Sequence, residues 1–338
     1  RILTMSNETS DFLKINQENL FSRKLESFIA QGKESKFYAE LSAEVQVECQ
    51  ALGFKEQDAI VTNLENLWLP VALDLATAKQ KLNRTFVQGI LGSQGTGKST
   101  LCEILQSILS YFGFSVATLS LDDLYLTYPQ RQILQQQDPR LLWRGPPGTH
   151  DLALGIKVIE QCLEENNPAH ILLPRFDKSA FNGAGDRTTP ETVIQPDILL
   201  FEGWFVGVQP LAPDSFSNCP APIVTEQDRQ FARDNNQRLQ AYLPLWSKLD
   251  SLIILYPEDY RLSKQWRKEA EHKMMAAGKT GMSDEEIDHF VEYFWQALHP
   301  GLFIKPLLSR ADLVIEIKSD RSLGRIYRPA NSSNELSK

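Results

Sequence analysis

Residues 86–105 read Phe-Val-Gln-Gly-Ile-Leu-Gly-Ser-Gln-Gly-Thr-Gly-Lys-Ser-Thr-Leu-Cys-Glu-Ile-Leu, and this stretch decides the fold. An apolar strand leads into a glycine-rich turn, a Lys-Ser-Thr triplet and the start of an amphipathic helix. The turn matches the phosphate-binding pattern G-x-x-x-x-G-K-[ST], with Gly92, Gly97, Lys98 and Ser99 at its fixed positions. A chance glycine turn would lack the Lys-Ser pair and the preceding apolar run. We therefore expect the chain to bind a nucleoside triphosphate.

Each residue type in this loop has a chemical reason. Glycines have no Cβ, so the backbone can adopt positive φ values and bring its N–H groups to phosphate oxygens. Lys98 is expected to neutralise the β- and γ-phosphates, and the Ser99 hydroxyl, in the first helical turn, is placed to ligate Mg²⁺. The expected ATP-binding residues are Gly92, Ser93, Gln94, Gly95, Thr96, Gly97, Lys98, Ser99 and Thr100.

The composition limits the class of protein. With 338 residues, 42% of them hydrophobic, the chain can bury a large core, and one elaborated domain fits better than two. A net charge of −8 without a block of like charges disfavours nucleic-acid and anionic-membrane partners. No apolar run approaches the roughly 20 residues of a membrane span. Scattered cysteines without C-x-x-C spacing, and a start without an apolar signal segment, predict a reduced, cytoplasmic protein. The oligomeric state is left open.

Strand and helix signals alternate along the chain. Helical periodicity covers residues from about 11 to 83, where Pro70 is expected to kink or break an apolar stretch. The alternation after this lead predicts an α/β fold with a mostly parallel sheet covered on both faces. The candidate strands are 86–91, 115–121, 170–173, 197–201, 251–256 and 312–317. Three stretches are expected to be irregular and to include the substrate site: 127–150, 174–196 and 209–226.

Two of these strands end in carboxylates. Asp122 and Asp123 follow the strand at 115–121, where an acid beside the phosphate loop can accept the proton of an attacking hydroxyl or hold Mg²⁺. The alternative is an Asp pair that caps the next turn. Glu202 ends the strand at 197–201 in the manner of a Walker B acid, and we expect it beside Ser99, binding Mg²⁺ directly or through water. A solvent-exposed glutamate is the alternative there.

The patterns Ser-x-Asp-x-Leu-Tyr at 120–125 and Phe-Glu-Gly-Trp at 201–204 resemble the uridine kinase, phosphoribulokinase and pantothenate kinase group of P-loop kinases. Within this group the chain is most similar to the D-glycerate 3-kinases of plants and cyanobacteria, which act in photorespiration. The resemblance spans residues about 60–318. Its phosphate loop is shared by many NTPases, whereas the segments Arg-Gly-x-Pro-Gly-Thr-His-Asp and Phe-Asp-Lys-Ser are far more specific to this group. The segments that carry it are 68–70, 92–100, 121–125, 138–140, 144–151, 174–179, 185–187, 202–204 and 266–271.

This resemblance implies an architecture. We expect a P-loop NTPase-type three-layer sandwich with a mostly parallel central sheet, an N-terminal helical extension packed on the core, and a helical lid. The expected divisions are the extension at 1–83, the kinase domain at 84–320 with substrate loops at about 127–150 and 174–196 and a lid at about 258–300, and a C-terminal tail at 321–338.

The resemblance also implies residue roles. Asp122 matches the catalytic base, with Asp123 as its neighbour, and Glu202 matches the Mg²⁺-linked acid. The segment with Arg261, Lys264, Arg267 and Lys268 resembles the lid whose cations close over the phosphates, and Arg267 is the expected catalytic one. A solvated basic helix face is the alternative.

A short hydroxy-acid substrate needs a cation for its carboxylate and polar groups for its hydroxyls. We expect Arg144 or Arg175 to bind the carboxylate. Ion pairs that only stabilise the loops, such as Arg175 with Asp177, are the alternative. The candidate substrate-binding residues are Asp122, Tyr125, Arg144, His150, Asp151, Arg175, Asp177 and Lys178. His170, His272, His289 and His299 show no metal-ligand spacing and are expected at surface or packing positions.

The sequence thus predicts an Mg²⁺- and ATP-dependent small-molecule kinase that phosphorylates a primary hydroxyl, with D-glycerate as the expected acceptor and 3-phosphoglycerate as the product. A related kinase for a nucleoside, a pantothenate-like alcohol or a sugar phosphate remains open, as does a noncatalytic ATP-binding protein. A regulatory GTPase is disfavoured because no Asn-Lys-x-Asp motif occurs. A motor or DNA-bound ATPase would be expected to carry a basic patch and a hydrolytic glutamate, of which the composition offers little.

Overall fold

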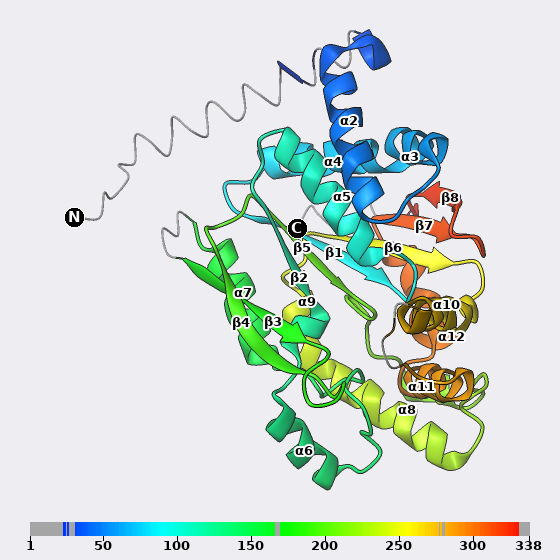
Figure 1. The fold of residues 1–338 in the computed structure, drawn as a ribbon. Helices are drawn as coiled ribbons and strands as arrows, with labels where there is room; N and C mark the ends of the chain where they lie inside the picture. The colour runs from blue at the N-terminus through cyan, green and yellow to red at the C-terminus, as the bar shows by residue number, and fades with distance from the viewer. Residues whose placement is uncertain are drawn as a thin grey trace.

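Six strands form the central sheet of the protein (Figure 1), in the order β2-β5-β1-β6-β7-β8. The computed structural model describes residues 23–24, 26, 31–165, 170–276, 278 and 281–330. These strands are β1 (Phe86–Gly92), β2 (Val116–Ser120), β5 (Ile198–Gly203), β6 (Ser251–Pro257), β7 (Leu313–Ile317) and β8 (Leu323–Tyr327). All pairings are parallel except that of β8 with β7. The predicted α/β fold with a mostly parallel sheet is confirmed.

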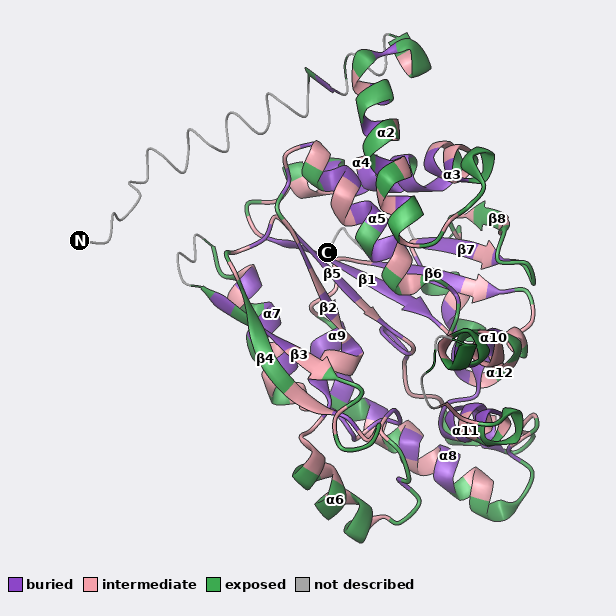
Figure 2. Ribbon diagram, in the orientation of Figure 1, coloured by how far each residue is buried: buried purple, intermediate pink, exposed green. Residues whose placement is uncertain are grey.

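The α-helices of the described residues are α2 (Lys36–Ala51), α3 (Gln57–Asn63), α4 (Leu69–Gln80), α5 (Lys98–Tyr111), α6 (Tyr128–Gln137), α7 (Leu152–Leu163), α8 (Glu226–Arg238), α9 (Leu243–Trp246), α10 (Leu262–Ala276), α11 (Asp284–Ala297) and α12 (Pro300–Phe303). Successive residues of a strand point to opposite faces of a sheet. Phe86 and Ile90 of β1 therefore pack in one buried cluster with α2, α4 and α5. Val87 and Leu91 pack in a second cluster with α7, α9 and α12. Helices thus cover both faces, and Figure 2 shows β1 buried along its length.

The N-terminal helices share the core of the nucleotide-binding part. Leu41 and Val45 of α2 are buried in the same cluster as Leu101 and Ile104 of α5. The part of the expected helical lead at residues 11–22 lies outside the described residues. Pro70 does not break the helix: it lies in the first turn of α4, directly after a π-helical segment at Leu64–Trp68. A proline is tolerated in a first turn because its missing N–H costs little there.

The strand expected at 170–173 does not join the central sheet. β3 (Ile171–Asp177) pairs antiparallel with β4 (Asp186–Val193) in a separate two-stranded sheet. The expectation of irregular structure at 174–196 is therefore wrong. β4 is mostly exposed (Figure 2), so its sequence lacks the apolar residues that mark a buried strand.

Two further expectations of irregular chain are corrected. The stretch 127–150 contains α6, which has no buried residue and so carries no apolar stripe. Its start was nevertheless readable, because Thr127 and Gln130 form a capping box and Pro129 lies in the first turn. The stretch 321–338, expected as a tail, contributes β8 to the central sheet, and residues 331–338 lie outside the described part. The stretch 209–226 has a short 3₁₀ turn at Pro213–Phe216 and reaches the first residue of α8 at Glu226.

The four cysteines, all within the described part of the chain, are free thiols, and Cys49, Cys102 and Cys162 are buried. Burial is the main cause that raises the pKa of the Cys162 thiol, to about 12. In the described ranges, no helix combines the length and apolar character that a membrane span needs.

Asp250 links the start of β1 to the start of β6, and its replacement tests how much this link stabilises the sheet. Its carboxylate accepts hydrogen bonds from both terminal nitrogens of Arg84, at 2.8 and 2.6 Å, and from the Val87 N–H at 2.9 Å. Asp250→Ala removes the carboxylate acceptor of the Val87 N–H and the ion-pair partner of Arg84, and is expected to lower the free energy of unfolding by about 2–3 kcal/mol in urea denaturation. Asp74→Ala, which removes an exposed pair with Arg328, is the control and should cost less than about 1 kcal/mol. Equal losses in the two variants would contradict this role.

Candidate active site

The glycine-rich loop joins β1 to α5 at the centre of the sheet. Gly95 and Gly97 have φ values of +82° and +88°, a region that residues with a Cβ rarely adopt. A Cβ on Gly95 would also lie 2.6 Å from the Trp266 Cβ of α10, so the loop needs glycine here for both conformation and space. Gly97 and Ser99 are exposed, and the free N–H groups at the start of α5 favour an anion.

The strand register brings Glu202 to this loop. In the parallel pairing, Glu202 of β5 is the partner of Ser120 in β2 and of Ile90 in β1. The Ser99 hydroxyl donates to Glu202 Oε1 at 3.3 Å. Glu202 therefore lies beside Ser99, where the sequence predicted it.

Ser99 and Glu202 fit a magnesium ion that arrives with a nucleotide. Mg²⁺ prefers oxygen ligands and commonly takes one or two from the protein, with water and phosphate oxygens completing its shell. The Ser99 hydroxyl and the Glu202 carboxylate supply two such oxygens. Among the described residues, no group of three or more His, Cys, Asp or Glu could hold a metal ion on its own. Ser99 and Glu202 are therefore the residues that could ligate an ion at the phosphate loop.

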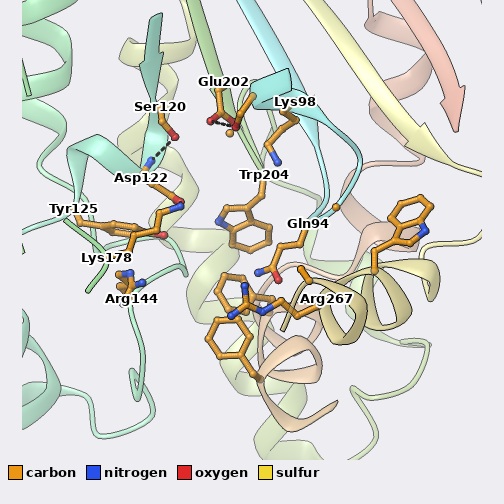
Figure 3. Close-up of a pocket in the computed structure, with 17 residues that line it drawn as sticks. Gln94, Lys98, Ser120, Asp122, Tyr125, Arg144, Lys178, Glu202, Trp204 and Arg267 are labelled. Atoms are coloured by element: carbon orange, nitrogen blue, oxygen red, sulfur yellow. Dashed lines mark hydrogen bonds and ion pairs between the residues drawn. The ribbon is translucent and has the colours of Figure 1, made fainter. Parts of the chain in front are cut away.

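A cavity of about 280 Å³ opens in front of the loop (Figure 3). Figure 3 shows Asp122, Tyr125, Lys178 and Arg144 along one wall, Gln94 and Arg267 along the other, and Trp204 between them. The lining residues are Gln94, Gly95, Lys98, Ser99, Ser120, Asp122, Tyr125, Arg144, Lys178, Glu202, Gly203, Trp204, Trp266, Arg267, Ala270, Phe290 and Phe294. The cavity thus brings together cations, two carboxylates and aromatic rings from distant parts of the chain.

The two neighbouring aspartates have different environments. Asp123 accepts hydrogen bonds from the Ser120 N–H at 3.0 Å and the Phe176 N–H at 3.2 Å, and pairs with Arg175 at 3.1 Å. It closes a capping box and ties β2 to β3. Asp122 instead lines the cavity, and its backbone N–H donates to the Ser120 hydroxyl at 3.2 Å. Of this pair, only Asp122 lines the cavity.

Asp122 is held in its ionised form. Burial pushes the pKa of its carboxyl upward, but the Lys178 ammonium and a hydrogen bond from Tyr125 leave the pKa below its ordinary value. The Lys178 Nζ lies 2.6 Å from Asp122 Oδ2. A carboxyl with a lowered pKa keeps its charge throughout the neutral range and loses it only as the pH falls through that lowered value. Asp122 can therefore accept a proton or a hydroxyl hydrogen bond at neutral pH.

His150 supports this wall from behind. It does not line the cavity, but its ring stacks on Tyr125 with centroids 4.5 Å apart. The Gly148 N–H donates to the Tyr242 hydroxyl at 2.9 Å, and that hydroxyl lies 2.7 Å from His150 Nδ1. Because burial lowers the pKa of His150 to about 3, the ring is neutral. His150 thus positions Tyr125.

Of the predicted cations for a carboxylate, Arg144 lines the cavity and Arg175 does not. The Arg144 guanidinium donates to the carbonyl oxygens of Gly183 and Ala184, at 2.7 and 3.0 Å, which fixes it against the β3–β4 turn. Arg175 is committed to Asp123 and to Glu191, with an Nη2–Oε2 distance of 2.5 Å. Its environment is that of a structural residue.

Two more predicted substrate residues lie outside the cavity. Asp151 caps α7 by accepting the Leu154 N–H at 3.0 Å, and it pairs with Arg187 at 2.8 Å. Asp177 is exposed and accepts hydrogen bonds from the backbone and hydroxyl of Ser179. Both carboxylates organise loops.

Of the four cations predicted for a lid, Arg267 lines the cavity. Its Nη2 pairs with Glu271 at 2.9 Å, and its buried Nε has no partner among the described residues. Lys264 and Lys268 instead join α10 to α11 through Glu292 at 2.6 Å and Asp288 at 2.9 Å. Arg261 is exposed and pairs with Asp259.

The sequence reasoning missed the aromatic part of the cavity. Trp204, Phe290 and Phe294 line it, and Trp204 packs edge-on against Phe294 with centroids 5.0 Å apart. The signal for Trp204 was its place directly after Glu202-Gly203, at the carboxyl end of β5. Phe290 and Phe294 lie four residues apart on α11 and resemble ordinary core positions, so nothing in the sequence marked them.

Comparisons with known proteins fit this geometry. No protein-family model matches the chain. D-glycerate 3-kinase, chloroplastic, of Arabidopsis thaliana is 34% identical over 247 residues, covering 69% of this chain and 52% of that protein. A Schizosaccharomyces pombe protein described as uncharacterized kinase mug58 is 33% identical, covering 62% of this chain and 79% of that protein. The chain belongs to the P-loop kinase family that includes D-glycerate 3-kinase.

The solved structure of a member of this family has the same fold. D-glycerate 3-kinase of Cryptococcus neoformans superposes with a TM-score of 0.69 at 28% identity, covering 78% of this chain and 99% of that chain. The chain spans about half the length of the Arabidopsis kinase. The expected resemblance to this kinase family is confirmed.

In a P-loop kinase, the loop lysine binds the phosphates of ATP. Lys98→Ala is expected to weaken ATP binding by about tenfold or more, because a charged hydrogen bond to phosphate is lost. Isothermal titration calorimetry with ATP measures this change. Lys81→Ala, at an exposed position after α4, is the control and should bind ATP as the wild type does. Unchanged affinity in the Lys98 variant would contradict the assigned loop geometry.

Proposed function

We propose that this protein transfers the γ-phosphoryl group of ATP to the primary hydroxyl of D-glycerate, giving 3-phosphoglycerate and ADP. The observation that carries the proposal is the wall formed by Asp122, Lys178 and Arg144, which faces the phosphate loop across one cavity. A carboxylate base next to two cations suits an acceptor that has both a hydroxyl and a carboxylate. The names of the Arabidopsis and Cryptococcus relatives support the same acceptor.

The size and lining of the cavity support a small acceptor. About 280 Å³ has to hold the phosphate end of ATP as well as the acceptor. Trp204 and Tyr125 supply apolar surface for a short carbon chain, and the Arg144 and Lys178 side chains supply the only cations on the acceptor wall of the described residues. A three-carbon hydroxy acid matches these features better than a nucleoside, which would need a larger stacking surface.

The residues divide the chemistry between them. Asp122 accepts the proton of the acceptor hydroxyl, whose oxygen attacks the γ-phosphorus in line. The new P–O bond forms as the bond from the γ-phosphorus to the bridging oxygen of ADP breaks. Lys98 and Arg267 stabilise the charge on the transferring group from the loop and the lid. Ser99 and Glu202 would hold Mg²⁺, which supplies positive charge to the phosphates when bound.

The organisation of the chain supports this use. We propose residues 84–320 as the kinase domain, with residues 1–83 as an extension that stabilises it through the shared core of α2 and α5.

The four free cysteines support a location in a reducing compartment such as the cytoplasm.

Asp122→Asn tests the role of the base. A coupled assay of ADP release compares D-glycerate, L-glycerate, uridine, pantothenate and ribulose 5-phosphate with no acceptor. We expect D-glycerate to give the largest acceptor-dependent rate, and Asp122→Asn to lower that rate by about 10²-fold or more with ATP affinity unchanged. Asp123→Asn, at the neighbouring position, is the comparison. It should lower the free energy of unfolding but have a smaller effect on the rate of phosphoryl transfer than Asp122→Asn. Another preferred acceptor would overturn the glycerate assignment, and ATP binding without turnover on any acceptor would indicate a noncatalytic protein.

Arg144→Met and Arg175→Met separate the two candidate carboxylate ligands. We expect Arg144→Met to raise KM for D-glycerate by about tenfold or more with KM for ATP unchanged, because one charged hydrogen bond to the substrate is lost. Arg175→Met should leave KM for D-glycerate within about twofold but lower the free energy of unfolding by about 1–3 kcal/mol, since Asp123 loses its partner. Steady-state kinetics and urea denaturation measure both. The reverse pattern would assign the carboxylate to Arg175.

A further inference from the structure

The side chain of Lys178 occupies the face of Asp122 that looks into the cavity. Its Nζ lies 2.6 Å from Asp122 Oδ2, and both residues line the cavity. Figure 3 shows the two side chains meeting on the acceptor wall. Lys178 follows the end of β3, and its side chain is 62% exposed, whereas that of Asp122 is 28% exposed. If the Lys178 ammonium moves away, the Asp122 carboxylate is therefore still in contact with solvent.

This contact competes with catalysis. A general base must come within about 2.6–3.2 Å of the hydroxyl whose proton it takes. Tyr125 already donates a hydrogen bond to the Asp122 side chain. With the Lys178 ammonium on Oδ2 as well, an incoming hydroxyl has to displace one of these donors before Asp122 can accept its proton. The exposed lysine is the easier of the two to displace, because Tyr125 is buried and stacked on His150.

A negative charge on the acceptor would provide the displacement. Arg144, the other cation on this wall, donates from Nη1 to the carbonyl oxygens of Gly183 and Ala184, and no ion pair joins it to Asp122 among the described residues. Lys178 has a flexible four-carbon stem and no other ion-pair partner among the described residues. An acceptor carboxylate is a new partner for the ammonium, whereas a neutral alcohol or water offers it no charge in exchange.

We propose that Lys178 is a specificity-determining residue that blocks Asp122 until the carboxylate of the acceptor draws the ammonium away. The inference rests on the proposed function of this site and adds a selection rule to it. An anionic hydroxy acid binds and frees the base in one step. Water and neutral alcohols meet a base that is still paired, so ATP is spared from hydrolysis when no acceptor is bound.

Lys178→Met tests the rule, because methionine keeps most of the unbranched side chain and removes the charge. The two probes are D-glycerate and methyl D-glycerate, which have the same hydroxyls and differ in the carboxylate. We expect kcat/KM for D-glycerate to fall by about tenfold or more, since a charged hydrogen bond is lost. We expect kcat/KM for the methyl ester, and the rate of ADP release without acceptor, to rise by about two- to fivefold, the range that an exposed ion pair allows.

The higher rates of Lys178→Met with the methyl ester and without acceptor distinguish a lysine that blocks Asp122 from one that only binds the carboxylate. If Lys178 only bound the carboxylate, D-glycerate would lose activity while the ester and water would react as before, and that result would overturn the proposal. Equal losses on both probes would show a structural role and would also overturn it. Lys178→Arg should restore the preference for D-glycerate, and Lys157→Met, an exposed lysine of α7, is the control. If the wild-type protein shows no ADP release that depends on D-glycerate, the proposed function itself is refuted. If the wild type is active but Lys178→Met has the same selectivity as the wild type, only the proposal for Lys178 is refuted.

Discussion

The parallel pairing of β5 between β2 and β1 is the constraint on which the site depends. Because parallel strands end at the same edge, the register places Ser120, Glu202 and Ile90 side by side, and the loops that follow these strands meet there. The phosphate loop follows β1, the Asp122 turn follows β2, and Trp204 follows β5. A shift of one residue in this register would turn Glu202 away from Ser99.

The second constraint is the close approach of α10 to the glycine-rich loop. Gly95 leaves room for Trp266, which is buried, and the Trp266 indole N–H donates to the Ser319 carbonyl oxygen at 3.2 Å after β7. The Arg321 guanidinium lies over the Trp266 ring, 5.5 Å from its centroid, and pairs with Glu269 at 2.7 Å. The first turns of α10 are thereby fixed against the phosphate loop, and Arg267, the residue after Trp266, lines the cavity.

The sequence was most informative where the chain is buried or where one motif determines the backbone. The strands of the central sheet other than β8 are apolar runs, and the loop glycines and Lys98 follow a fixed spacing, so both could be predicted. The roles of Arg175 and Asp151 could not, because each is decided by a partner distant in sequence, Glu191 or Arg187. The exposed elements α6 and β4 escaped for a related reason: a segment with little buried surface has no apolar period to detect. Lys178 was predicted to touch substrate, but its pairing with Asp122 depends on the β3–β4 turn folding back over the cavity.

These features describe one arrangement, in which an ionised carboxylate and two cations face a phosphate loop at the edge of a parallel sheet. Phosphorus-31 NMR of the products formed from ATP and D-glycerate examines that arrangement directly, because it reports which oxygen received the phosphoryl group. We expect ADP and 3-phosphoglycerate in equal amounts, because we propose that the primary hydroxyl reaches Asp122 while Arg144 and Lys178 bind the carboxylate. Formation of 2-phosphoglycerate, or of inorganic phosphate alone, would show that the acceptor does not lie on this wall as we describe.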